Sequence, residues 1–206
     1  MAKSAPRKLP ACFQQGMGES GLQVMKFHGK VYYCSQKDDC NFICNQMRTE
    51  STEVVGFDIE WKVTFTNEVR RTALIQLCPS RDICYLFHIS MMNGFPSELK
   101  LLLESEAITK VGVGIHNDMQ KLTSDFGVKA KGYSELSDLA NLKLKTSEKW
   151  SLKGLTMNLF KQRIPKDNKV RCSDWEKYPL SRTQESYAAL DAYVGYAIYM
   201  KLVEME

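Results

Sequence analysis

The sequence predicts a mixed α/β domain in which helices cover a central sheet. Three observations predict it: strand-like runs dominate residues 31–89, helical periodicity dominates from residue 96 onward, and one apolar strand at residues 110–115 interrupts the helices. With 206 residues and 44% hydrophobic side chains, the chain is long enough for one domain with a sizeable core.

Most of the predicted strands lie in the first half of the chain. Residues 1–21 are broken by Gly and Pro and are expected to form a flexible tail, so the domain is expected to cover residues 22–206. A short strand at residues 31–34 and a helix at 38–47 come first. Three further strands are predicted at residues 54–61, 72–78 and 83–89, and the turn signals between them indicate an antiparallel meander.

The second half is predicted to be mainly helical. A helix from residue 96 carries three leucines spaced for one buried face. Asn117 and Ser151 are candidate N-caps of two later helices. Ser181, with Gln184 three residues on, fits a capping box at the start of the last helix, whose apolar residues then recur at helical spacing.

Composition narrows the function classes. No apolar run reaches the ~18 residues that a membrane span needs, so no membrane association is expected. The seven cysteines form no C-x-x-C pair, which disfavours a zinc site and favours reduced thiols in a nuclear or cytosolic protein. The chain has no H-E-x-x-H motif and no phosphate-binding G-x-x-x-x-G-K-[ST] loop, so neither a zinc hydrolase nor an ATP site is predicted.

The predicted strand at residues 54–61 carries two carboxylates on one face. Side chains alternate along a strand, so Asp58 and Glu60 project to one side, and the apolar Phe57, Ile59 and Trp61 take the other. Neighbouring carboxylates in an apolar strand repel each other, which makes a hard divalent cation their natural partner. The alternative interpretation is a pair of solvated acids at a strand end.

Two further motifs place acidic residues on helices. Tyr187 and Asp191 are four residues apart in the last predicted helix and therefore share a face. Asp118 follows a Val-Gly-Val-Gly strand and opens a helix, where the helix dipole favours a carboxylate. Each motif alone also has an ordinary interpretation: a core tyrosine with a solvated aspartate, and a helix-capping carboxylate.

In this order along the chain, the three motifs resemble those of the DEDDy 3′–5′ exonucleases, which share an RNase H-like fold with RNase D and proofreading exonuclease domains. Residues 73–78, 84–89, 150–152 and 174–180 are similar to the Werner helicase type of this domain. The resemblance implies an RNase H-like mixed sheet flanked by helices, with Tyr187 orienting the attacking water. It also implies that two Mg²⁺ or Mn²⁺ ions are bound by four catalytic carboxylates: Asp58, Glu60, Asp118 and Asp191.

The function that the resemblance implies is hydrolysis of DNA from 3′ ends, releasing 5′-mononucleotides. Recessed or duplex-associated 3′ ends as substrate, a role in DNA repair or replication, a nuclear location and a RecQ-type helicase in cis or in trans are inherited expectations of the same kind. Two alternatives stay open. One is an RNase D-like 3′ exoribonuclease, because the carboxylates do not read the 2′-hydroxyl; the other is a non-catalytic nucleic-acid-binding module.

Charge placement favours a polyanionic partner. The chain has a formal net charge of +4, and residues 143–177 hold ten basic residues against four acidic ones. Trp150 and Trp175 in this segment are available for base stacking if they are exposed. Gln120 stands where the Werner-type pattern has a tryptophan, so stacking from that position is not expected. The candidate nucleic-acid contacts are Lys121, Lys145, Lys149, Lys169 and Arg171.

Overall fold

The computed structural model describes residues 21–50, 52–64, 68, 70–165 and 167–205. Of the predicted tail at residues 1–21, all but Gly21 lies outside the described residues. No described helix is both long and apolar enough to cross a lipid bilayer.

A six-stranded mixed sheet forms the centre of the domain, in the order β2-β5-β4-β3-β6-β7. Its strands are β2 (Lys30–Cys34), β3 (Val54–Glu60), β4 (Leu74–Cys78), β5 (Ile83–Phe87), β6 (Thr109–Gly112) and β7 (Tyr133–Glu135). β3, β4 and β5 pair antiparallel, which confirms the predicted meander, whereas β2, β6 and β7 join as parallel strands. A small second sheet pairs β1 (Gln23–Val24) with β8 (Gln162–Arg163).

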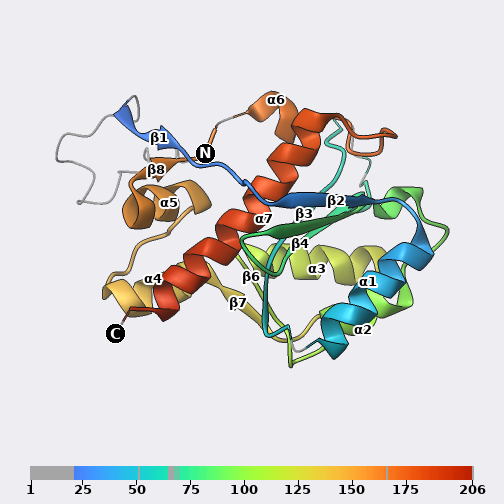
Figure 1. Cartoon of the computed structure of the whole chain (residues 1–206), viewed down its shortest axis with the longest axis horizontal. Helices are drawn as coiled ribbons and strands as arrows, with labels where there is room; N and C mark the ends of the chain where they lie inside the picture. The colour runs from blue at the N-terminus through green and yellow to red at the C-terminus, as the bar shows by residue number, and fades with distance from the viewer. Residues whose placement is uncertain (1–20, 51, 65–67, 69, 166, 206) are drawn as a thin grey trace, which may run out of the picture.

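Helices lie on both faces of the six-stranded sheet (Figure 1). They are α1 (Lys37–Thr49), α2 (Ser97–Glu104), α3 (Ile115–Phe126), α4 (Leu136–Leu144), α5 (Leu152–Phe160), α6 (Asn168–Arg171) and α7 (Arg182–Val203), with a 3-10 turn η3 (Ile89–Met91). On one face, α1, α2 and α3 bury residues such as Leu102 and Met119 against Phe57 of β3. On the other, α7 crosses the sheet and packs Ala188 against Leu86 of β5.

The helix starts show where the sequence was informative and where it was not. Ser151 caps α5, and Ser181 with Gln184 forms the predicted capping box of α7. Asn117 is not a cap, because α3 already begins at Ile115. Gly114, at φ 78°, is the residue before that helix, in a left-handed conformation that glycine adopts without strain.

Strand boundaries also differ from the prediction. β6 ends at Gly112 and not at residue 115, because the chain turns into α3 through Gly114. The strands β1, β7 and β8 were not predicted. Each has two or three residues, too few for an alternating pattern to be recognised.

Candidate active site

Close packing between β3 and α7 brings two parts of the site together. A Cβ at Gly56 would lie 2.0 Å from the backbone oxygen of Ala192, so only glycine at this position allows the helix to approach so closely. Asp58 and Glu60 follow on the same face of β3, two and four residues further on. The approach therefore places both carboxylates beside the middle of α7.

On α7, small buried side chains face the sheet and carry the next part of the site. Ala188, Ala189 and Ala192 are fully buried, and their small side chains let α7 lie close to the sheet. Tyr187 and Asp191 lie one turn apart on this helix, and the Tyr187 hydroxyl hydrogen-bonds the Asp191 carboxylate.

The first turn of α3 supplies Asp118. The start of this helix is fixed by Glu135 of β7, whose Oε2 accepts hydrogen bonds from the backbone N–H groups of Gly114 at 2.7 Å and Ile115 at 3.1 Å. Glu135 therefore takes the N-terminal capping role that the sequence had suggested for Asn117. Because Glu135 caps α3, the Asp118 side chain is not used as a cap and lines the cleft described next.

The predicted carboxylates converge. Asp58, Glu60 and Asp191 each offer an oxygen atom within 4.8 Å of the other two. Asp118 and Tyr187 line the same cleft, which has a volume of about 330 Å³. All five predicted catalytic residues, drawn from β3, α3 and α7, therefore meet at one place.

Burial raises the pKa of all four carboxyl groups in the cleft, and neighbouring carboxylates add to the rise for Asp58, Glu60 and Asp118. The pKa of Asp58 lies well above its usual range because the group is buried and faces Asp191 and Asp118. Burial, followed by the charge of Asp58, raises the pKa of Glu60 to about 10. Burial and the neighbouring Glu135 raise the pKa of Asp118 to about 7. Positive charge stabilises the ionised form of such a cluster.

Asp191 and Tyr187 affect each other in opposite directions. Burial raises the pKa of Asp191 to about 6, against the lowering effects of the Tyr187 hydrogen bond and of Arg171. The Tyr187 hydroxyl has its pKa raised by burial and by the adjacent Asp191 charge. Tyr187 is therefore a hydrogen-bond donor at neutral pH and not a base.

Arg171 brings positive charge to the carboxylate cleft. It lines the cleft, and its charge opposes the rise in the pKa values of Glu60 and Asp191. An adjoining cavity shares Arg171, Tyr187 and Asp191 and adds Lys153 and Asn168. Basic and polar groups thus continue the site beyond the carboxylates.

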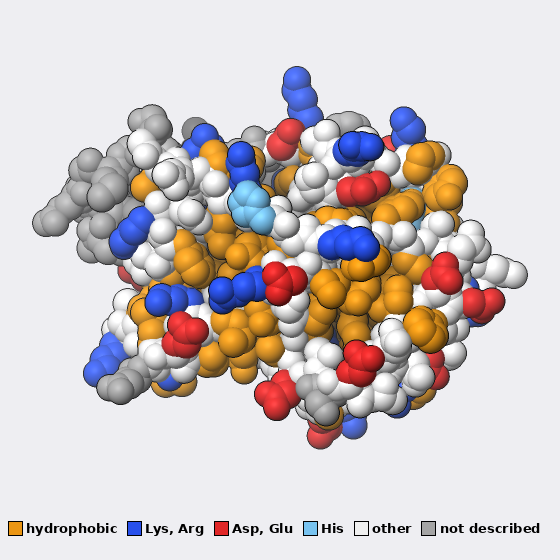
Figure 2. Space-filling model, viewed as in Figure 1, with side chains coloured by type: hydrophobic (Ala, Val, Ile, Leu, Met, Phe, Trp, Pro, Cys, Tyr) orange, Lys and Arg blue, Asp and Glu red, His pale blue; other side chains and the backbone are white. Residues whose placement is uncertain are grey.

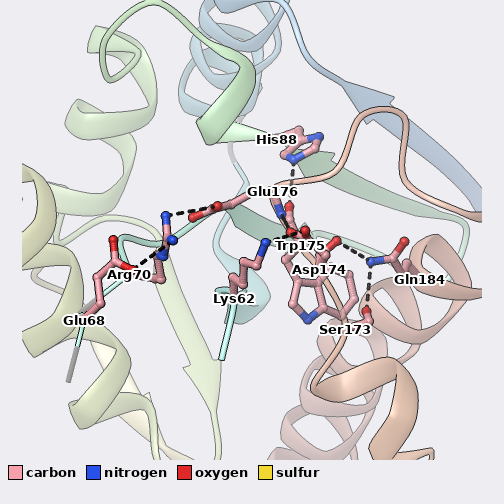
Figure 3. Close-up of polar contacts among 9 residues, drawn as sticks. All are labelled: Lys62, Glu68, Arg70, His88, Ser173, Asp174, Trp175, Glu176 and Gln184. Atoms are coloured by element: carbon pink, nitrogen blue, oxygen red, sulfur yellow. Dashed lines mark hydrogen bonds and ion pairs between the residues drawn. The ribbon is translucent and has the colours of Figure 1, made fainter. Parts of the chain in front are cut away.

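The segment that follows Arg171 is anchored on two sides (Figure 3). Asp174 pairs with Lys62 at 2.5 Å and Glu176 with Arg70 at 3.6 Å, which links the segment to the loop after β3. The Trp175 backbone oxygen lies 2.9 Å from His88 Nε2. From α7, the Gln184 amide reaches the Ser173 hydroxyl and the Asp174 backbone oxygen. These contacts hold the chain beside the cleft.

The predicted nucleic-acid contacts are not gathered at one place. Arg171 lines the cleft, and Lys145, Lys149 and Lys169 are exposed. On the face drawn in Figure 2, Lys and Arg side chains are spread among hydrophobic ones and form no single patch. Lys121 is half-buried, pairs with Asp125 at 3.1 Å and donates to the Arg70 backbone oxygen at 2.7 Å.

Neither tryptophan meets the condition of exposure that base stacking requires. Trp150 and Trp175 are 5% and 0% exposed and belong to the core. Their indole N–H groups are also satisfied within the protein, by Asn141 and by the Arg171 backbone oxygen. Sequence reasoning also missed Glu135 and Lys153. Glu135 directly precedes α4, a position that suggests only a local capping role.

Solved structures share this architecture. The exonuclease domain of Aedes aegypti Nibbler matches with a TM-score of 0.75 and 20% identity, covering 88% of this chain and 92% of that one. Escherichia coli RNase D matches with a TM-score of 0.72 and 21% identity, covering 85% of this chain and 44% of that one. The fold, with its acidic cleft between β3, α3 and α7, defines the chain as a member of the RNase H-like class.

Within that class the chain belongs to the 3′–5′ exonuclease family, whose model matches residues 32–205. It is 46% identical over 195 residues to the mouse bifunctional 3′–5′ exonuclease/ATP-dependent helicase WRN, covering 93% of this chain but 14% of that protein. It is 37% identical to a 3′–5′ exonuclease of Arabidopsis thaliana, of which it spans 66%. The resemblance to the DEDDy exonucleases is thereby confirmed.

Proposed function

We propose that this domain is a metal-dependent 3′–5′ exodeoxyribonuclease that removes 5′-mononucleotides one at a time from DNA 3′ ends. The observation that carries the proposal is the convergence of Asp58, Glu60, Asp118, Asp191 and Tyr187 in one cleft. Family membership supports the exonuclease activity. DNA as the substrate is the finer part of the proposal, supported by similarity to a helicase-linked exonuclease of mouse.

The carboxylate set fits two Mg²⁺ or Mn²⁺ ions. Hard oxygen ligands suit both cations, and four carboxyl groups with raised pKa values are a costly arrangement unless positive charge neutralises them. When bound, a pair of divalent ions supplies Lewis-acid stabilisation of the entering and leaving oxygens of phosphodiester hydrolysis. Asp58, Glu60, Asp118 and Asp191 would hold them.

The remaining groups position the substrate and the water. Tyr187 keeps its proton and can donate a hydrogen bond, so its role is to orient the attacking water. Arg171 lies beside the carboxylates and is suited to hold a phosphate of the strand, since its guanidinium can donate two parallel hydrogen bonds. Lys145, Lys149 and Lys169 would contribute longer-range attraction to the backbone.

A labelled duplex with a recessed 3′ end tests the proposal. We expect a ladder that shortens from the 3′ end with Mg²⁺ or Mn²⁺ and is absent in EDTA. Asp191→Ala should abolish the ladder while the protein stays folded, and Asp138→Ala, which removes an exposed acid in the first turn of α4, should retain it. Equal activity in Asp191→Ala and in the wild type would contradict the proposed site.

The second candidate substrate is RNA. The solved RNase D that shares this fold is described as an exoribonuclease involved in structured RNA processing. The carboxylates bind phosphates and do not distinguish the two sugars. Matched DNA and RNA strands with identical 3′ sequences separate the two candidates, and a higher kcat/KM on the RNA would overturn the assignment to DNA.

We also propose a nuclear role in DNA repair or replication alongside a RecQ-type helicase. The mouse relative joins exonuclease and helicase in one protein by its name, and the present chain spans 14% of it. Two measurements test this setting: imaging of a fluorescent fusion for nuclear location, and co-purification of a helicase from cell extract. A wholly cytoplasmic fusion would contradict the nuclear role.

A further inference from the structure

One buried side chain close to the cleft has no hydrogen-bond partner. Among the described residues, the buried side-chain nitrogen and oxygen atoms without a partner are Arg70 Nε and both amide atoms of Gln76. Arg70 uses its other nitrogens in ion pairs with Glu68 and Glu176. Gln76 is 0% exposed, and its whole amide is unsatisfied.

Gln76 lies directly opposite Asp58 in the β3–β4 ladder. Residues opposed in an antiparallel pair project to the same face, with Cβ atoms about 4.5–5.5 Å apart. That face is covered by α7, because a Cβ on Gly56, two residues before Asp58, would run into the backbone of Ala192. Gln76 does not line the cleft itself but lies buried behind it, on the strand next to Asp58, a predicted metal ligand.

The polar side chains of β3 on this face are Asp58, directly opposite Gln76, and Glu60, diagonal to it, so Asp58 is the nearer match by register. Leu86, opposite Gln76 on β5, and Ala188 on α7 are apolar and buried. Trp175, in the same apolar cluster, already donates its indole N–H to the Arg171 backbone oxygen. Asp58 uses one carboxylate oxygen, Oδ1, to accept the Ile59 N–H at 2.9 Å.

A buried amide without partners costs folding free energy that a methionine or leucine of similar size would not. An amide next to a metal-binding carboxylate can donate a hydrogen bond to it without adding another charge to the acidic cluster. A glutamate at this position would add one more repulsive group instead.

We propose that Gln76 is a positioning residue for Asp58: its Nε2, which has no partner in this structure, is placed to donate a hydrogen bond to the Asp58 carboxylate when the site binds a divalent cation, and so to set its orientation. This inference rests on the proposed function, since it assigns Gln76 to the same metal site. Gln76 touches neither substrate nor cation, so its effect passes through Asp58.

The variant that tests it is Gln76→Met, with Leu86→Met as the matched control. Both introduce methionine on the same face of neighbouring strands. We expect Gln76→Met to keep or raise the metal-free Tm, to raise the Kd for Mn²⁺ measured by calorimetry about 10- to 100-fold, and to lower kcat by a similar factor. The KM for DNA should not change. Gln76→Leu serves as the second variant if Gln76→Met does not fold.

Each outcome decides the question. Wild-type Mn²⁺ affinity in a folded Gln76→Met protein would overturn the positioning role, as would an equal loss of affinity in Leu86→Met. If the wild type binds Mn²⁺ but cleaves no nucleic acid, the proposed function fails while the Mn²⁺ affinities still decide the role of Gln76. If the wild type binds no divalent ion, both proposals fail together.

Discussion

Replacing Asp191 by Asn is expected to stabilise the metal-free protein at pH 8 while removing its hydrolytic activity. Burial raises the pKa of Asp191 from 3.8 to about 6, against the lowering effects of Tyr187 and Arg171. In the unfolded chain the carboxyl group returns to its ordinary pKa. Above pH 6 the native protein must therefore hold a buried charge that the unfolded chain holds in water.

The sign and size follow from linkage. A raised folded-state pKa contributes stability that is present below about pH 4 and is lost as the pH rises through about 6. Each pH unit between the two pKa values corresponds to about 1.4 kcal/mol, so the loss at pH 8 is about 3 kcal/mol. Asn is neutral and similar in shape, and relief of this loss should raise Tm by about 6–12 °C in a domain of this size.

Thermal unfolding in EDTA at pH 4 and pH 8 provides the assay. The difference between Asp191→Asn and the wild type should be large at pH 8 and small at pH 4. Asp125→Asn is the matched control, because that carboxylate accepts two hydrogen bonds from Thr72 and pairs with Lys121. Its Tm should fall. A lower Tm for Asp191→Asn at pH 8 would refute the reasoning that the carboxylate cluster is strained without metal.

Three further substitutions test separate parts of the site. Tyr187→Phe should leave folding intact and lower kcat about 10- to 150-fold, the effect of one hydrogen bond to a charged group, and a normal single-turnover rate would contradict it. Arg171→Ala should raise the KM for DNA and reduce the salt dependence of binding by about one phosphate contact. Lys201→Ala should do neither, because Lys201 lies about 15 Å along α7 from Asp191 of the cleft. Gly56→Ala should destabilise the protein in urea by about 1–3 kcal/mol or more because its Cβ collides with α7, while Gly21→Ala, with open space around it, should match the wild type.

The sequence predicted the parts of the site that local geometry determines. Strand alternation puts Asp58 and Glu60 on one face, and helical spacing puts Tyr187 and Asp191 on one side of a helix; the structure has both arrangements. The meander and two helix caps follow from similarly local patterns. That Asp118 joins them came from resemblance to a family, since nothing local brings α3 to β3.

What the sequence could not predict depends on contacts between distant segments. Trp175 lies in a polar, basic stretch that suggests exposure, yet it is buried because His88 and Gln184 hold its loop against the sheet. In the sequence, Gln76 looks like any other residue of a predicted strand. Its unsatisfied amide becomes visible only when the register places it opposite Asp58.

The contact between Gly56 and Ala192 also bears on how the protein comes to be active. The carboxylates of β3 and α7 are separated by more than 130 positions along the chain, so their cluster is a high-contact-order feature. In a partly folded chain whose sheet has formed but whose α7 is undocked, Asp58 and Glu60 are in place on β3 without Asp191. Assembly of the carboxylate cluster is thus coupled to the docking of α7 on the sheet.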